Sequence, residues 1–235
     1  MNAAEILEQL ESLGNEGTKK ILMKHGAQEP FFGVKVGDLK PIQKKIKKNH
    51  ELSLELFDTG NSDAMYLAGL IADEKKISKA DLQYWVSKAN WYMLSEYTVA
   101  WIASESNFGW ELGLEWIESE NEMIASAGWS TLSNLASIKP DEELDLDKYS
   151  SLLDQVGESV HDAQNRVRYT MNGFVIAVGC YIESLTEKSK AIAQKIGKVQ
   201  VDVGGTACKV PLATDYIQKV IDKNRVGKKR KMARC

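Results

Sequence analysis

Two arginines at the start of one amphipathic segment are well suited to binding an anion. The segment from Asn165 to Tyr181, NRVRYTMNGFVIAVGCY, carries Arg166 and Arg168 in what would be its first helical turn, and the chain has only five arginines. The planar arginine fork donates to two phosphate oxygens at once, which a lysine cannot do. The segment therefore predicts a helix with a phosphate site at its start. The alternative is ordinary pairing with a nearby acid such as Asp162 or Glu158.

The charges of the chain are strongly segregated, although its net charge is only −3. Lys35 to Lys48 carries six lysines against one aspartate, a net charge of +5. Lys219 to Arg234 carries eight basic residues against one aspartate, a net charge of +7. Glu51 to Asp147 carries 19 acidic residues against five lysines, a net charge of −14. This pattern indicates one surface for an anionic partner and another that faces solvent. A solvated acidic middle with a disordered basic tail is the alternative.

The apolar residues recur at helical spacing, so we expect an all-α protein. In Ala3 to Leu13 they fall on one face, and Gly14 follows. Asn61 and Ser78 are expected N-caps. Pro140 separates the middle helices from a later group that starts near Leu146.

Two middle segments repeat at an offset of 31 residues. The sequence WVSKAN at 85–90 aligns with WIESEN at 116–121, and LAGLIA at 67–72 aligns with TVAWIA at 98–103. A period of this size that holds two short helices is typical of a stacked array of helix pairs. Because each pair cannot bury its apolar face alone, neighbouring pairs stack, and the array curves into a concave surface.

Residues 196–211, IGKVQVDVGGTACKVP, interrupt the helical pattern near the C-terminus. Gly204 and Gly205 favour a tight β-hairpin, because both central positions of such a turn need positive φ. The valines of the two strands would form an apolar face that docks on the helices, and Lys198 and Lys209 would face outward. The hairpin is either a cap on the end of the array or an arm that reaches into nucleic acid.

Several classes of protein are disfavoured. There is no apolar run near 18 residues, so we expect no membrane partner. The N-terminal segment lacks the basic start and apolar middle of a secretion signal. Three scattered cysteines fit free thiols in a cytoplasmic protein. Neither they nor the three scattered histidines suggest a metal site, and we expect no cofactor and a monomer.

The repeat, the segment FFGVKVGDLKPIQKKIK at 31–47, the segment NRVRYTMNGFVIAVG at 165–179 and the hairpin sequence together resemble the DNA alkylation repair superfamily. Its best-known member is the AlkD glycosylase, an array of HEAT-like helix pairs. The resemblance implies a single HEAT-like repeat domain over residues 1–235, with a hairpin insertion at 197–211 and a basic tail at 224–235. The hairpin is similar to that of the AlkF/AlkG-type branch, for which the family implies binding to branched or distorted DNA more than excision of alkylated bases.

The resemblance also implies where a catalytic motif would lie. AlkD-type enzymes carry a serine, two tryptophans and, four residues after the second, a catalytic aspartate on one helix. In this chain Trp91 keeps one indole, Tyr92 replaces the other, and Glu96 stands at the position of the aspartate. An aromatic face can contact a cationic alkylated nucleoside, and a carboxylate can stabilise an oxocarbenium-like sugar or activate water. Core packing of Trp91 and Tyr92, with Glu96 as an exposed helix acid, is the alternative.

Three hypotheses follow. The first is a DNA-binding protein that recognises branched or distorted DNA, whose binding would weaken steeply with salt. Its expected DNA-binding residues are Lys44, Lys45, Lys47, Lys48, Arg166, Arg168, Lys198, Lys209, Lys228, Lys229 and Arg230. The second is a glycosylase that excises alkylated purines with Glu96 as the essential carboxylate. The third is a protein-binding helical scaffold whose acidic middle takes a basic partner.

Overall fold

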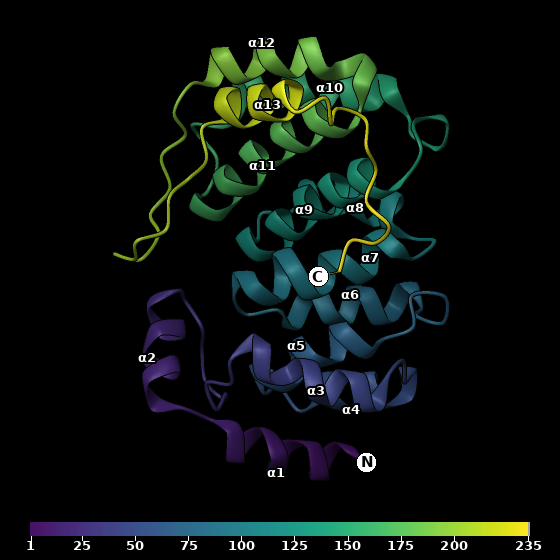
Figure 1. The fold of residues 1–235 in the computed structure, drawn as a ribbon, viewed down its shortest axis with the longest axis vertical. Helices are drawn as coiled ribbons and strands as arrows, with labels where there is room; N and C mark the ends of the chain where they lie inside the picture. Colours follow the sequence, from purple (N-terminus) through teal and green to yellow (C-terminus); the bar gives the residue numbers. More distant parts are fainter. Residues whose placement is uncertain (235) are drawn as a thin grey trace.

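The computed structural model describes residues 1–234, and Cys235, the last residue of the expected basic tail, lies outside the described residues. The described chain contains thirteen α-helices, stacked from the N-terminus to the C-terminal helix (Figure 1). Their bounds are α1 Ala3–Leu13, α2 Glu16–Lys24, α3 Val36–Ile46, α4 His50–Asp58, α5 Ser62–Ile71, α6 Lys79–Lys88, α7 Ala100–Glu105, α8 Gly109–Ile117, α9 Glu122–Ile138, α10 Leu146–Ser159, α11 Asn165–Tyr181, α12 Thr186–Ile196 and α13 Ala213–Asp222. A π-helical turn, η1 (Met93–Val99), runs directly into α7, and two short 3₁₀ turns, η2 (Asp141–Glu143) and η3 (Glu183–Leu185), precede α10 and α12.

The helix ends are set by local side-chain caps. The side chain of Asn61 accepts hydrogen bonds from the backbone N–H groups of residues 63 and 64, at 3.0 and 3.2 Å. Ser78 and Asp81 bond to each other's backbone N–H groups at the start of α6, which satisfies two donors that a helix start leaves unpaired. Both expected N-caps are confirmed, and α1 and α11 have the bounds read from the apolar spacing.

Five elements, of which η1 and α7 are continuous, form a central row that runs through the array. Helix α5 packs on η1, η1 and α7 pack on α9, and α9 packs on α11. The first of these contacts is close because Gly69 lies against Thr98, where an added Cβ would approach the threonine methyl to 2.6 Å. The row is flanked by α4, which packs on α5, and by α8, which packs on α9.

The 31-residue repeat is visible in the structure. Trp85 in α6 and Trp116 in α8 are both buried at equivalent positions. A row of polar contacts links these two helices: the Trp116 indole N–H donates to Gln83 Oε1 at 2.9 Å, and Lys79 pairs with Glu111 at 2.7 Å. Each repeat therefore contacts the next through residues about one period apart, as the sequence predicted.

Two hydrophobic clusters follow one another along the stack. The first is formed mainly by α1 to α8, and within it Phe57 and Trp85 stack with ring centroids 4.2 Å apart. The second is formed by α9 to α13, where Tyr149 and Phe174 stack at 5.7 Å. No helix in the described chain combines the length and the hydropathy that a bilayer crossing requires.

The expected β-hairpin is not supported, because residues 1–234 contain no β-strand. Residues 197–211 instead form an extended arm that doubles back at Gly204 and Gly205, each with φ of +68° (Figure 1). Across the turn the backbone makes only one bond, from Thr206 N to Val203 O at 3.4 Å. The turn and the docking of Val199 in the second hydrophobic cluster agree with the sequence, but the ladder between the two legs does not form.

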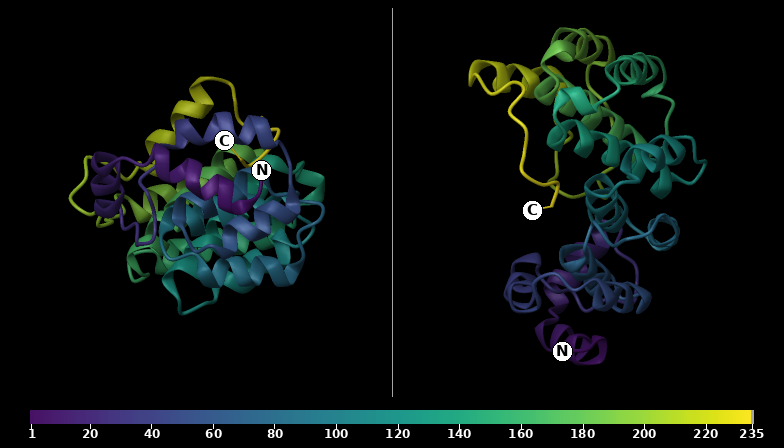
Figure 2. Two further views of the ribbon diagram at one scale, coloured as in Figure 1. Left: turned by 90° about the horizontal axis from the view of Figure 1, so that it is seen from below. Right: turned by 90° about the vertical axis from the view of Figure 1, so that its right-hand side faces the viewer.

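The basic tail, residues 224–234, is ordered and folds back along the hollow side of the bowed stack (Figure 2). Its donors bond in turn to the last residues of α11, α9 and α5. The pairs are Gly227 N to Cys180 O (3.0 Å), Arg230 N to Ser137 O (2.7 Å) and Arg234 Nη1 to Ala72 O (2.8 Å). Cationic residues suit this path, because helix C-termini carry unpaired carbonyls and partial negative charge.

Candidate nucleic-acid interface

A cavity of about 540 Å³, which we call the arm cavity, opens between α2, the start of α11 and the arm. Four aromatic side chains line it, together with Arg166 and residues of the arm tip. The lining includes Lys24, His25, Asn90, Trp91, Tyr92, Tyr97, Glu122, Asn165, Arg166, Tyr169, Asp202, Gly204 and Cys208.

Arg166 is the central cation of the arm cavity. Its Nε and Nη2 donate to the two carboxylate oxygens of Glu96 at 2.8 and 2.6 Å. Its guanidinium lies between two aromatic rings, 4.2 Å from the centroid of Tyr92 and 4.4 Å from that of Tyr169. A bidentate carboxylate and two ring faces hold the guanidinium in one orientation. The alternative that Arg166 pairs with an acid is therefore correct, but the acid is Glu96 and not Asp162 or Glu158.

Glu96 is buried behind Arg166, with only 3% of its side chain exposed. The alternative that it is an exposed helix acid is therefore wrong. Burial raises the pKa of the Glu96 carboxyl to about 7, although the hydrogen bonds from Arg166 favour the ionised form. Because Arg166 lines the cavity and Glu96 does not, the cavity presents the cation and not the carboxylate.

The buried Glu96 lies within the π-helical turn η1. The segment from Met93 to Val99 is wider than an α-helix, and π-turns of this kind are frequent at functional sites. Trp91, just before it, is buried in the first hydrophobic cluster, which agrees with the core-packing alternative. Its indole N–H has no hydrogen-bond partner among the described residues. Tyr92 and Glu96 do converge, because both contact Arg166.

Two tyrosines of the arm cavity were not among the predicted site residues. Tyr97 and Tyr169 both line it, and burial raises the pKa of each hydroxyl. Tyr169 had a usable signal, since it lies three residues after Arg166 and such a spacing places two side chains on one helix face. Neutral phenol rings around one cation offer stacking surfaces for bases beside a charge for phosphate.

The arm closes one side of this cavity. Asn165 at the start of α11 bonds both to the backbone N–H of Asp202 and to its carbonyl, at 2.7 and 2.9 Å. At the tip, Gly204 lies so close to the carbonyl of Lys24 that a Cβ there would collide with it. The backbone groups that a hairpin ladder would use are thus partly engaged by α11. Lys198 and Lys209 are exposed on the arm.

A second cavity, of about 850 Å³, lies at the opposite ends of the central-row helices and is walled by the tail; we call it the tail cavity. Its lining is rich in cations. The residues are Gln43, Lys44, Lys47, Lys48, Leu70, Glu74, Glu105, Ile138, Lys139, Lys231, Met232 and Arg234.

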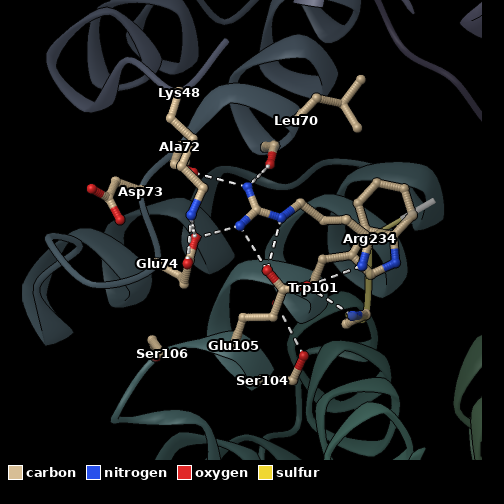
Figure 3. Close-up of polar contacts among 12 residues, drawn as sticks. Lys48, Leu70, Ala72, Asp73, Glu74, Trp101, Ser104, Glu105, Ser106 and Arg234 are labelled. Carbon is tan, nitrogen blue, oxygen red and sulfur yellow. Dashed lines mark hydrogen bonds and ion pairs between the residues drawn. The ribbon is translucent and has the colours of Figure 1, made fainter. Parts of the chain in front are cut away.

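Arg234 anchors the tail in this cavity (Figure 3). Its guanidinium bonds to Glu74 Oε2 at 2.5 Å and to Glu105 Oε2 at 2.7 Å, and only 9% of its side chain is exposed. Lys48 bonds to Glu74 from the other side, at 2.5 Å. Burial opposes ionisation of Glu74, yet Lys48 and Arg234 hold the pKa of its carboxyl below the ordinary value. Nothing in the sequence singled out Arg234, Glu74 or Glu105.

The predicted DNA-binding residues are thus divided between several places. Lys44, Lys47 and Lys48 line the tail cavity, whereas Lys45 is exposed on α3 outside its lining. Arg168 lies half-buried on α11, and its Nε has no partner in residues 1–234.

The three predicted cations of the tail also differ in their surroundings. Lys228 is exposed. Lys229 pairs with Asp141 at 2.7 Å, and Arg230 donates to the carbonyl of Ala233 at 3.0 Å. Contact of Lys229 or Arg230 with DNA would compete with these bonds.

Comparison with known proteins assigns the chain to a family. Residues 6–194 match the family described as "DNA alkylation repair enzyme". The uncharacterized protein Lin0241 of Listeria innocua is 37% identical over 225 residues, which cover 93% of this chain and 96% of the relative. The uncharacterized protein Lmo0209 of Listeria monocytogenes is 35% identical over 223 residues, covering 92% of this chain and 96% of the relative.

This chain belongs to the DNA alkylation repair family. A solved structure superposes on the whole chain, with a TM-score of 0.91, 42% sequence identity and 100% coverage of both chains. It is described as "a new family of proteins related to the HEAT-like repeat DNA glycosylases with affinity for branched DNA structures". The all-α, HEAT-like repeat fold predicted from the sequence is thereby confirmed.

No group of three or more histidine, cysteine, aspartate or glutamate side chains within residues 1–234 is arranged to hold a metal ion. The two cavities of this member of the DNA alkylation repair family are lined by residues that include arginines, lysines, glutamates and, in the arm cavity, aromatic side chains.

Proposed function

We propose that this protein binds branched or otherwise distorted DNA. The observation that carries the proposal is the similarity over the full length to a protein described as having affinity for branched DNA, at 42% identity and a TM-score of 0.91. We further propose that the chain acts as one domain.

The spacing of the two cavities fits a branched ligand. Helix α9 has 17 residues, and its first residues line the arm cavity while its last residues line the tail cavity. At 1.5 Å per residue the two cavities are about 25 Å apart along that helix. One phosphate cannot contact both, so a ligand that engages both cavities does so with different parts of its backbone, such as two arms of a junction.

The arm provides the third element of the proposed surface. Lys198 and Lys209 are exposed on its two legs, and neither makes an ion pair with a described residue. Lys209 directly follows Cys208, which lines the arm cavity, so the arm would bring a backbone-binding cation near the stacking surfaces of that cavity. We propose that unstacked or distorted bases at a branch point approach the arm cavity.

The test is a titration by fluorescence anisotropy with a four-way junction and a linear duplex of equal length, at several salt concentrations. We expect tighter binding to the junction and a linear fall of log K with log salt. The variant Lys198→Gln/Lys209→Gln should flatten the slope by about 1.8 if both lysines contact phosphate. The control Lys75→Gln/Lys88→Gln removes the same charge from exposed positions outside both cavities and should keep the wild-type slope.

Equal affinity for both DNAs, unchanged by the arm variant, would overturn the proposal for branched DNA. Failure to bind any DNA at low salt would favour the protein-scaffold hypothesis.

Excision of alkylated purines is a second candidate, because the family is described as an enzyme family and the arm cavity is lined by aromatic rings. Glu96 could act only after Arg166 releases it, since both carboxylate oxygens are engaged. The assay measures abasic sites in duplexes that carry a methylated purine. Release that is equally fast in Glu96→Gln would remove Glu96 from the reaction, and absence of release would remove the activity for that substrate.

A further inference from the structure

The tail cavity holds two carboxylates that would oppose the binding of an anion. Glu74 and Glu105 lie among the lysines of its lining. The guanidinium of Arg234 sits between them, and the backbone N–H groups of Ala233 and Arg234 also donate to Glu105 Oε1, at 2.7 and 3.2 Å (Figure 3). The end of the tail is thus built to satisfy these two acids.

The tail also changes the charge balance of the cavity. With the tail in place, the lining has six cationic side chains against two carboxylates, a net charge of +4. Lys231 and Arg234 contribute two of those cations, so the same lining without the tail would carry +2. The tail therefore doubles the positive charge of a cavity whose remaining cations come from α3, from the two residues that follow it, and from Lys139 directly after α9.

Three of these lysines are available to a ligand. Lys44, Lys47 and Lys231 are exposed and make no ion pair or side-chain hydrogen bond with another described residue. Lys48 and Lys139 are engaged by Glu74 and Glu143, respectively. Unpaired lysines around one cavity are the chemistry that contacts a phosphodiester backbone, since each contact releases condensed counterions.

We infer that the C-terminal tail contributes directly to the DNA-binding surface, in addition to stabilising the fold. Arg234 neutralises Glu74 and Glu105, and Lys231 adds a phosphate contact beside Lys44 and Lys47. The inference rests on the proposed function and names the tail cavity as a site for the DNA backbone.

The experiment uses the full-length protein and measures salt-dependent binding of a four-way junction by anisotropy. Lys231→Gln should flatten the salt slope by about 0.9, the loss of one phosphate contact. Arg234→Gln should weaken binding about fivefold, the effect expected for one uncompensated unit charge near a phosphate in water. Lys223→Gln removes a charge from an exposed residue directly before the tail and outside the lining, and it is the matched control, with wild-type binding expected.

The decisive variant is Arg234→Gln/Glu74→Gln/Glu105→Gln. It removes the anchor together with the acids that the anchor neutralises, so the lining keeps five cations and no carboxylate. We expect affinity at or above that of the wild type. Thermal unfolding of each variant, followed by circular dichroism, shows whether the affinities compare folded proteins.

The outcomes separate the inference from the proposed function. A wild-type protein that binds no DNA at low salt overturns both. A wild-type protein that binds DNA, with Lys231→Gln binding as the wild type does, overturns the role of Lys231. If Arg234→Gln binds weakly and the triple variant does not recover, the tail serves the fold alone and the inference fails.

Discussion

Arg166 and Arg234 lie at opposite ends of the helices that form the central row, and each pairs with glutamate. Arg166 faces one carboxylate, Glu96, and is flanked by two tyrosine rings in the arm cavity. Arg234 faces two carboxylates, Glu74 and Glu105, and is surrounded by lysines in the tail cavity. In both places an arginine guanidinium pairs with glutamate carboxylates, and at Glu74 it shares this role with Lys48.

The two pairs differ in what they leave for a ligand. Glu96 is buried behind Arg166, so the cavity is lined by the guanidinium and two tyrosine rings and not by the carboxylate. Such a lining suits a base stacked beside a phosphate. Arg234 is itself hidden, and the cations that remain for a ligand are the lysines around it. Pairing of arginine with glutamate thus leaves a cation beside tyrosine rings at one cavity and lysine side chains at the other.

The largest expected effect is the loss of the Arg166 guanidinium. Arg166→Met leaves Glu96 buried without its partner, and breaking a buried ion pair from one side typically costs about 3–5 kcal/mol in the free energy of unfolding. Urea denaturation near pH 8 measures it. The double variant Arg166→Met/Glu96→Leu should recover most of the loss, because it removes both charges. Equal losses in the single and double variants would mean that the pair contributes packing and not charge compensation.

The cost of Arg166→Met should also depend on pH. The folded-state pKa of Glu96 is about 7, above its unfolded value of about 4.5, so the stability that this group contributes is complete below pH 4.5 and is lost as the pH rises through 7. Removing Arg166 takes away a group that favours the ionised form, so the pKa of Glu96 rises further. The penalty should therefore be smallest near pH 5 and grow by up to roughly 1.4 kcal/mol per pH unit above 7.

Urea denaturation of both proteins at pH 5.5 and 8.5 checks this dependence. Glu96→Gln has no titrating group at this position, and adding Arg166→Met to it should give a cost that is flat with pH. A penalty for Arg166→Met that falls as the pH rises would contradict the assignment of the raised pKa.

A smaller effect is expected at the other end of the row. Arg234→Met should destabilise the fold by about 2 kcal/mol, less than Arg166→Met, because Lys48 still compensates Glu74 and the site adjoins solvent. Denaturation under the same conditions as for Arg166→Met gives the comparison. A larger loss than that of Arg166→Met would reverse the ranking of the two anchors.

The parts of this molecule that could be predicted from its sequence are those set by neighbouring residues. The bounds of α1 and α11, the caps at Asn61 and Ser78, and the 31-residue repeat all follow from local spacing. The two anchors could not be predicted in this way, because Arg166 lies 70 residues from Glu96 and Arg234 lies 160 residues from Glu74. A sequence shows that an arginine needs a partner, but not which acid the fold brings to it.

The structure of the arm could be predicted from the sequence only in part. Its turn was predicted from Gly204 and Gly205, because positive φ is a local requirement, and both glycines have it. Its strands were predicted from alternating valines, yet no ladder forms. The side chain of Asn165 binds the backbone of Asp202, so the leg is held by α11 and not by the opposite leg. Tertiary contacts decided the structure of a segment whose intrinsic preference was weak.

The smallest expected effect separates the arm's turn from its contact with α2. Gly204→Ala and Gly205→Ala both place an alanine at φ of +68°, which costs about 1 kcal/mol of local strain in each. Only at Gly204 does the added Cβ meet the carbonyl of Lys24, whereas nothing lies within 4 Å of a Cβ at Gly205. Gly204→Ala should therefore push the tip away from α2, and Gly205→Ala should not. In a Cys235→Ser background, the reactivity of the exposed Cys208 thiol toward a disulfide reagent reports the opening of the arm cavity, because Cys180 is buried. Faster labelling in Gly204→Ala alone would make the arm a closing element over Arg166. Equal labelling in both variants would mean that the strain of the turn, and not the contact with α2, sets the position of the arm.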